Sequence, residues 1–149
     1  MRIGSGWDLH HLKAGRPLIL GGIIIPSLRG EEAHSDGDVL IHAIIDALYG
    51  ALGDGDIGSH YPDTDPAYKD VSSMRLLDDT LTHMGERNII NLDSTIILDE
   101  PKLRPYIDTI RKNLADAMHL SIGQVSIKAK TSEHTALDVI SAQAVVLLS

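Results

Sequence analysis

Two histidines and one aspartate near the start of the chain have the residue types and spacing of a metal site. Asp8 and His10 lie two apart in RIGSGWDLH, residues 2–10, which alternates like a β-strand, so their side chains point to one face. His42 lies in DVLIHAIIDAL, residues 38–48, a run typical of a helix. If that helix meets the strand, the three side chains make a three-ligand site with one open position, the arrangement of a catalytic zinc ion.

The helix that carries His42 is apolar on nearly every side. Its exceptions are Asp38, His42, Asp46 and Gly50, spaced by four, which draws one narrow stripe along a helix that is otherwise expected to be buried. Such a stripe either follows a cleft or is a solvated face with an ordinary surface histidine. The first alternative fits a metal site.

The segment before this helix, AHSDGD at residues 33–38, has two interpretations. Serine and aspartate are preferred N-cap residues, so part of it serves capping. A cluster of backbone N–H groups at a helix start also suits phosphate, and His34 and Ser35 would add side-chain donors. Capping does not explain His34.

The composition bounds the class of protein. The chain has 149 residues, 43% hydrophobic, with no Phe and no Cys, so a Leu, Ile and Val core is expected and disulfides and thiolate zinc sites are excluded. The net charge of −8 and the absence of a basic run argue against nucleic-acid binding. An acidic protein with an anionic substrate needs a local cation, a second argument for a metal. The longest apolar run, residues 17–26, is too short to span a bilayer, and no signal-peptide pattern is present.

The remaining segments predict an α+β fold. Apolar runs flanking Gly21 and Gly22 predict a hairpin with a two-residue turn, followed by a loop at residues 27–36. Helices are expected at residues 38–52, 72–84 and from 102, and strands at residues 89–98, 124–131 and 142–148. Residues 53–66 form a long loop rich in Asp, Gly and Pro, of a kind that is more often functional than idle. This order predicts a single domain over residues 1–149, a sandwich of one mixed sheet with helices layered on one side, plus a hairpin.

Four motifs occur in order and at the spacing of one family. They are RIGSGWDLH (2–10), AHSDGD (33–38), GDIG (55–58) and YPDTDP (61–66). Together they resemble the 2-C-methyl-D-erythritol 2,4-cyclodiphosphate synthase family of the non-mevalonate isoprenoid pathway, and the likeness extends to about Glu133. The resemblance implies a lyase that converts 4-diphosphocytidyl-2-C-methyl-D-erythritol 2-phosphate to the 2,4-cyclodiphosphate and CMP. The substrate's own 2-phosphate attacks the β-phosphorus, so positioning and charge neutralisation dominate.

The same resemblance assigns metals and catalytic residues. It implies that a Zn²⁺ ion acts as Lewis acid and template, with a β-phosphate oxygen in the open position. Glu133 is implied to hold a Mg²⁺ or Mn²⁺ ion that bridges the α- and β-phosphates. His34 and Thr131 are implied to stabilise the transition state. The implied zinc ligands are Asp8, His10 and His42.

Substrate-binding positions follow by the same likeness. Residues 56–58 are implied to meet the ribose, Asp63 the methylerythritol hydroxyls, and residues 98–104 the cytosine. Taken singly, such residues could be turn formers or surface charges. Taken together with the spacing of the motifs, they favour a role in substrate binding. The implied positions are Ser35, Asp56, Ile57, Gly58, Tyr61, Asp63, Asp65, Leu98, Pro101, Lys102, Leu103, Arg104, Lys130 and Ser132, with Asp46 as a further candidate that contacts substrate or orients His42.

The family is also a homotrimer with active sites between neighbouring subunits, which implies that the zinc ligands come from one copy and the cytidine pocket and Glu133 from the next. A cytoplasmic location in a bacterium, or a mature form in a plastid-type organelle, is expected. No membrane or nucleic-acid partner is expected.

The chain departs from the family after Glu133. A glycine-rich segment usual there is several residues shorter, so no residue is carried over from it and no isoprenoid diphosphate ligand is expected on the trimer axis. Lys130 also stands where the family has a small or hydroxylic residue. Two alternative functions remain open: a metal-dependent phosphohydrolase that uses the same four residues, Asp8, His10, His34 and His42, and a binding protein that has lost turnover with its shortened tail.

Overall fold

The computed structural model describes residues 1–149 and is built on one five-stranded sheet. The strands follow the order β4-β1-β7-β5-β6. Neighbours are antiparallel except for β5 and β6, which run parallel, so the sheet is mixed. The strands are β1 (Arg2–Ala14), β4 (Arg29–Glu31), β5 (Ile89–Ile97), β6 (Val125–Lys130) and β7 (Val139–Leu148).

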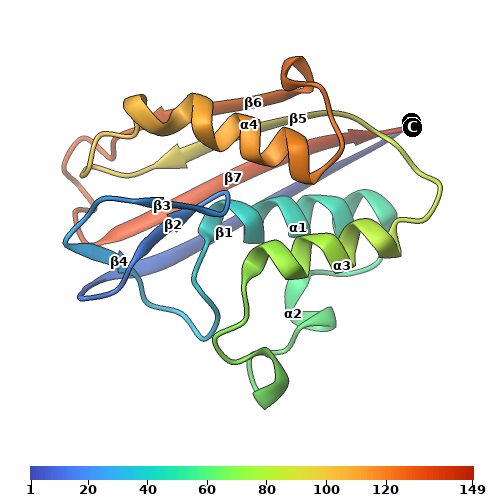
Figure 1. The fold of residues 1–149 in the computed structure, drawn as a ribbon. Coiled ribbons are helices and arrows are strands. Elements are labelled where there is room, and N and C mark those ends of the chain that lie inside the picture. The colour runs from blue at the N-terminus through green and yellow to red at the C-terminus, as the bar shows by residue number, and fades with distance from the viewer.

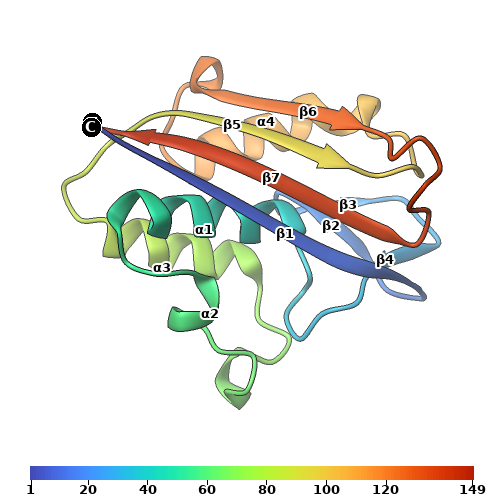
Figure 2. The same ribbon diagram turned by 180° about the vertical axis from the view of Figure 1, so that it is seen from behind.

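The helices cover one face of this sheet and leave the other uncovered (Figures 1 and 2). Helix α1 packs on β1 and β7, α3 packs on α1, and α4 lies over β6. The predicted α+β sandwich with helices on one side is therefore confirmed. The helices are α1 (Val39–Leu52), α2 (Ile57–His60), α3 (Ser73–His83) and α4 (Ile107–Ala117), with 3₁₀ turns η1 (Pro66–Tyr68), η2 (Arg104–Tyr106) and η3 (Ile122–Gln124).

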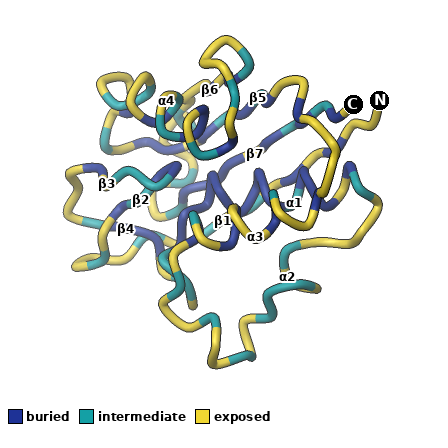
Figure 3. Tube along the Cα trace, turned by 45° about the vertical axis from the view of Figure 1, so that its right-hand side comes forward, coloured by how far each residue is buried: buried dark blue, intermediate teal, exposed yellow.

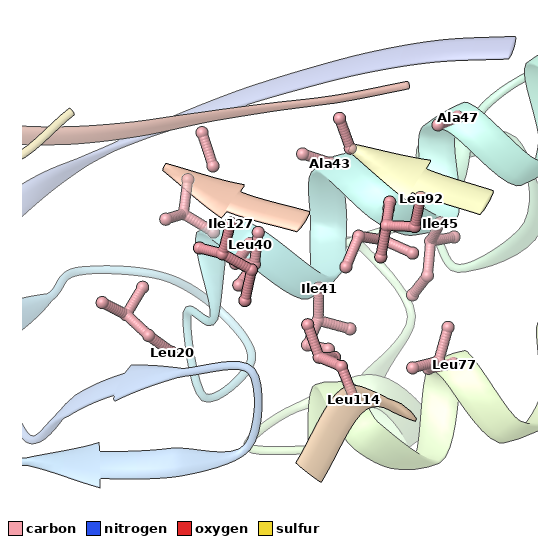
Figure 4. Close-up of a cluster of buried hydrophobic side chains, with 14 of the residues drawn as sticks. Leu20, Leu40, Ile41, Ala43, Ile45, Ala47, Leu77, Leu92, Leu114 and Ile127 are labelled. Atoms are coloured by element: carbon pink, nitrogen blue, oxygen red, sulfur yellow. The ribbon is translucent and has the colours of Figure 1, made fainter. Parts of the chain in front are cut away.

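Helix α1 is the centre of the core. Figure 3 shows it buried along almost its whole length, and Figure 4 shows its aliphatic side chains among those of α3, α4 and the sheet. Two glycines of β1 let it approach the sheet closely. A Cβ built on Gly4 would lie 1.9 Å from the Ala47 carbonyl oxygen, and one on Gly6 would lie 2.0 Å from that of Ala43.

The predicted hairpin is present as a separate two-stranded sheet, β2 (Leu18–Leu20) with β3 (Ile23–Ile25). Gly21 and Gly22 both have positive φ, as a tight two-residue turn requires. Both of their N–H groups donate to the carboxylate of Asp38, at 3.0 and 2.8 Å. Asp38 thus joins the hairpin to the start of α1.

Several boundaries differ from those predicted. Strand β1 continues past His10 to Ala14 because β4, which lies in the predicted loop 27–36, pairs with its last three residues. Helix α4 begins at Ile107 rather than near residue 102, since Pro105 lies in the 3₁₀ turn η2. Helix α2 lies within the predicted loop 53–66 and η1 begins at its last residue, each capped by an aspartate.

Glu31 is a fully buried carboxyl group beneath the hairpin. Its Oε2 accepts the Ile19 N–H at 3.2 Å, while Oε1 has no hydrogen-bond partner. Burial and then the neighbouring charge of Asp38 raise the pKa of Glu31 to about 9. The group is therefore neutral near pH 7, which is how a buried carboxyl without a cation is tolerated.

Glu31→Gln is expected to stabilise the protein at about pH 8 by on the order of 2 kcal/mol and to change little near pH 4.5. The folded-state pKa lies above the ordinary value of 4.5, so the contribution of Glu31 is fully present below that value and is lost as the pH rises toward 9. Glutamine stays neutral and does not titrate. Urea unfolding of both proteins across this range measures the difference, and identical pH dependence would contradict the expectation.

Candidate metal centre and substrate pocket

The three predicted metal ligands converge at the place where α1 crosses β1. Asp8 and His10 alternate toward the helix-covered face, and the close approach that Gly6 permits brings His42 to them. Asp8 Oδ2 lies 2.9 Å from His10 Nε2 and 2.9 Å from His42 Nδ1, and the two ring nitrogens are 3.3 Å apart. The predicted convergence of these three side chains is confirmed.

The electrostatics of this cluster favour an ionised carboxylate. Burial opposes ionisation of Asp8, but the hydrogen bonds and charges of His10 and His42 outweigh it and hold the pKa of Asp8 well below its usual range. Burial likewise lowers the pKa of His42, but its bond to Asp8 and the charge of that group outweigh burial and leave this pKa raised. The cluster thus places an ionised carboxylate beside the ring nitrogens of two histidines, a set of donor atoms that suits a cation.

The far side of the His42 ring is held by hydroxyl groups. Nε2 lies 2.9 Å from Ser73 Oγ and 3.2 Å from Ser35 Oγ. The Ser73 hydroxyl in turn donates to Asp36, whose carboxylate also accepts the Ser73 N–H at 3.0 Å. A proton on Nε2 shared with these oxygens leaves Nδ1 free to face an ion, which is the usual outer support of a ligating histidine.

The donor set fits a small divalent metal. One carboxylate oxygen and two ring nitrogens have 2.9–3.3 Å between them. A tetrahedral ion about 2.0–2.1 Å from each ligand separates those ligands by about 3.3 Å. Only small adjustments would therefore let these three side chains hold an ion, which would supply Lewis acidity beside the neighbouring cavity.

A cavity of about 500 Å³ adjoins the cluster. It is bounded by His10 and His42, by residues from the loop before α1, and by residues of the α2 segment and the start of α3. Its floor includes apolar side chains that the sequence did not single out: Tyr68, Val71 and Leu76. The predicted site residues that line it are His10, His34, Ser35, His42, Ile57, Gly58, Tyr61 and Asp63.

Several predicted positions make hydrogen bonds around α2 and η1; Asp46, Asp56 and Asp65 do not line the cavity, whereas Tyr61 does. Asp46 Oδ1 accepts the Ile57 N–H at 2.8 Å. Asp56 caps α2 through Ser59, and Asp65 caps η1. The Tyr61 hydroxyl contacts those of Tyr49 and Thr80 at 3.2 and 3.3 Å. These contacts shape one wall of the cavity.

The start of α1 is not the open anion site that the sequence suggested. Asp38, the last residue of the predicted capping segment 33–38, is the N-cap, and its carboxylate accepts the Ile41 N–H at 3.1 Å. It is 0% exposed, so no ligand reaches this helix end. Of the predicted polar stripe, only His42 lines the cavity. Asp38 is buried under the hairpin and Gly50 lies beside Ser5.

A second cavity of about 470 Å³ lies between the end of β5, η2 and β6. It holds four cationic side chains in a chain of net charge −8, those of Lys102, Arg104, Lys128 and Lys130. The predicted residues that line it are Leu98, Lys102, Leu103, Arg104, Lys130 and Thr131. Pro101 lies beside it, on a neighbouring depression that it shares with Lys102.

The remaining predicted residues lie on the turn after β6. Thr131 Oγ1 donates to Glu133 Oε1 at 2.9 Å, so these two side chains are in contact. The Ser132 hydroxyl is engaged within the turn, donating to Asp99 and accepting the Ala136 N–H. The two cavities share no lining residue, so neither Thr131 nor Glu133 borders the cavity beside the metal cluster.

Sequence reasoning missed the residues that support the site. By residue type and position, Ser73 is compatible with an ordinary cap of the helix at residues 72–84, and Asp36 with a cap of α1. Asp99 received no role. A capping side chain looks the same in sequence whether or not it also touches a ligand, so only the tertiary contact of Ser73 with His42 reveals the difference.

The fold and the cluster define a class, the single-sheet α+β proteins with three potential metal ligands beside a cavity. The YgbB family profile matches residues 1–149. The 2-C-methyl-D-erythritol 2,4-cyclodiphosphate synthase of Syntrophotalea carbinolica is 50% identical, over 100% of this chain and 94% of that protein. That of Bacillus subtilis is 46% identical, over 99% and 97%. A solved 2C-methyl-D-erythritol-2,4-cyclodiphosphate synthase with CDP bound matches with a TM-score of 0.93 at 41% identity, over 99% and 100% of the two chains.

The chain therefore belongs to the YgbB family, the family of the 2-C-methyl-D-erythritol 2,4-cyclodiphosphate synthases. The family and the activity predicted from the sequence are confirmed, and that activity is of the phosphorus–oxygen lyase kind and belongs to isoprenoid biosynthesis. No helix has both the length and the apolar character needed to cross a membrane.

Proposed function

We propose that the Asp8–His10–His42 cluster is the zinc centre at which this chain forms 2-C-methyl-D-erythritol 2,4-cyclodiphosphate and CMP from 4-diphosphocytidyl-2-C-methyl-D-erythritol 2-phosphate. The observation that carries the proposal is the cluster itself, which opens onto a cavity lined by His34 and Ser35. A bound Zn²⁺ ion supplies Lewis acidity at a phosphate oxygen. The protein's own residues supply the rest.

The larger cavity suits the methylerythritol end of the substrate. His34 is exposed on its wall and has a ring nitrogen to offer a phosphate oxygen, and Ser35 adds a hydroxyl. Asp63 lies on the same wall, where its carboxylate can accept hydrogen bonds from sugar hydroxyls. The 2-phosphate and the β-phosphorus are thereby held close together, and proximity is the main requirement of an intramolecular displacement.

The second cavity suits the cytidine end. Leu98 and Leu103 give it apolar walls for a base, and the cations around it attract a diphosphate. Thr131 lines this cavity, and Glu133 lies two residues further along the turn that follows β6. A lone exposed carboxylate such as Glu133 fits a Mg²⁺ or Mn²⁺ ion that takes its other ligands from phosphate oxygens and water.

The active site is assembled between copies of the chain in a homotrimer. One chain keeps its two cavities separate, although a single substrate molecule must reach both. The uncovered sheet face carries exposed apolar side chains, among them Ile3, Trp7 and Ile97, which a second copy would bury. Sharing of the site between neighbours explains both features.

Phosphorus NMR tests the proposal on the purified chain with Zn²⁺ and Mg²⁺. Addition of the substrate is expected to give the paired signals of the cyclic diphosphate together with CMP. Release of inorganic phosphate would instead support the phosphohydrolase. Unchanged substrate signals, with the protein folded and zinc bound, would support a binding protein without turnover.

A further inference from the structure

The carboxylate of Asp99 is buried beneath the turn that follows β6. Asp99 lies two residues past the end of β5 and is 3% exposed; its one ion-pair contact is with the imidazole of His134 in the turn, whose Nδ1 lies 3.9 Å from Oδ1. The backbone around it continues the β5–β6 pairing, since the Leu98 N–H donates to the Lys130 carbonyl oxygen at 2.9 Å. The parallel pair thus places Asp99 directly beneath residues 131–136.

Asp99 accepts three hydrogen bonds, all from this turn. Oδ1 accepts the backbone N–H groups of Ser132 and His134, both at 3.2 Å, and Oδ2 accepts the Ser132 hydroxyl. The Ser132 Oγ in turn accepts the Ala136 N–H at 2.9 Å. One carboxylate therefore organises the turn from its second residue to its sixth.

The turn needs such an anchor because its backbone is unfavourable. Glu133 and His134 both have positive φ, 55° and 61°, a region in which non-glycine residues are strained. Consecutive N–H groups in such a turn converge into a concavity that attracts an anion. Here the anion is the chain's own Asp99 rather than a ligand.

We propose that Asp99 is a positioning residue for the reaction, acting through this turn to hold Thr131 and Glu133 in their working geometry. The inference rests on the proposed roles of those two residues. Their side chains are already in contact, and the Glu133 N–H also donates to Thr131 Oγ1 at 3.3 Å. Loss of the anchor frees the backbone between them and with it the direction of the Glu133 carboxylate.

The test is Mn²⁺ binding to the zinc-loaded full chain in the presence of CDP, followed by electron paramagnetic resonance. Asp99→Ala is expected to weaken Mn²⁺ binding by about 10- to 100-fold, the range for supports of metal ligands, and to raise the Mg²⁺ concentration for half-maximal turnover in step. Zinc content stays unchanged. Asp99→Asn keeps one acceptor oxygen, so its Mn²⁺ affinity is expected to lie between those of the wild type and Asp99→Ala. It remains informative if the alanine variant fails to fold.

Gln124→Ala is the matched control. Gln124 organises the opposite end of β6. Its Oε1 accepts the Ser121 N–H and Oγ–H, both at 3.0 Å, and its Nε2 donates to the carbonyl oxygens of Ile89 and Ile90 at the start of β5, at 3.2 and 2.9 Å. Its loss breaks a comparable set of bonds and is expected to leave Mn²⁺ binding unchanged. If both Asp99 variants bind Mn²⁺ like the wild type while Glu133→Gln binds it poorly, the role of Asp99 is overturned and the role of Glu133 stands. Wild-type Mn²⁺ binding by Glu133→Gln would overturn the role of Glu133 and the inference with it.

Discussion

Replacing His42 by alanine is expected to remove zinc from the protein and to lower kcat by about 10³-fold or more. His42 supplies one of the three ligand atoms of the proposed centre, and its ring contacts the Ser73 and Ser35 hydroxyl groups. Alanine leaves Asp8 and His10, two ligands that hold a divalent ion poorly. Metal content per chain, measured by atomic emission, and the rate of CMP release are the readouts.

His119→Asn is the control for this variant. His119 is an exposed histidine after α4, borders neither proposed subsite, and has a positive φ that asparagine also tolerates. It is expected to keep wild-type zinc content and rate. A His42→Ala protein that is folded, free of zinc and fully active would contradict the proposed centre.

Mixed oligomers extend the same experiment to the shared site. His42→Ala and Glu133→Gln are each expected to be nearly inactive alone. In an equal mixture unfolded and refolded together, a site is complete only where a Glu133→Gln chain donates the metal ligands and a His42→Ala neighbour donates Glu133. Random assembly then restores about one quarter of the wild-type activity. No recovery would mean that each chain builds its own site.

The metal cluster was accessible from sequence because each part has a local signature. The i, i+2 spacing in an alternating segment places Asp8 and His10 on one face, and the apolar run around His42 fixes a buried helix. That the two elements meet was inferred from the polar stripe on the apolar helix and from the resemblance to the family. The structure supplies the reason, since glycines at positions 4 and 6 allow backbone contact between them.

The supporting residues could not be predicted, because their function depends on contacts between distant segments. Asp38 follows the pattern of the polar stripe, yet it caps its own helix and holds the hairpin turn. Asp36 and Ser73 are 37 residues apart and meet only behind His42. Asp99 is separated from its three donors by a helix and a strand. The residue type alone does not distinguish a polar side chain in solvent from one that forms hydrogen bonds to a segment distant in sequence.

Gly6→Ala is expected to destabilise the protein by about 3 kcal/mol or more. The new Cβ would lie 2.0 Å from the Ala43 carbonyl oxygen and 2.7 Å from the Ala47 N, so a backbone rather than a mobile side chain must move. Relief requires α1 to shift away from β1. Urea unfolding measures the loss, and Gly123→Ala is the matched control because nothing lies within 4 Å of a Cβ at that position.

The same variant tests whether β1–α1 packing sets the metal geometry. Gly6 lies two residues before Asp8 on β1, and its Cβ would press on the helix one position from His42. A shift of α1 lengthens the distances from His42 Nδ1 to Asp8 Oδ2 and to His10 Nε2. The distance between Asp8 and His10 stays the same, because both residues lie on β1. Zinc affinity is therefore expected to fall in the folded Gly6→Ala protein, below its unfolding midpoint, and to stay unchanged in Gly123→Ala. Loss of stability with unaltered zinc affinity would mean that the ligands adjust independently of the packing.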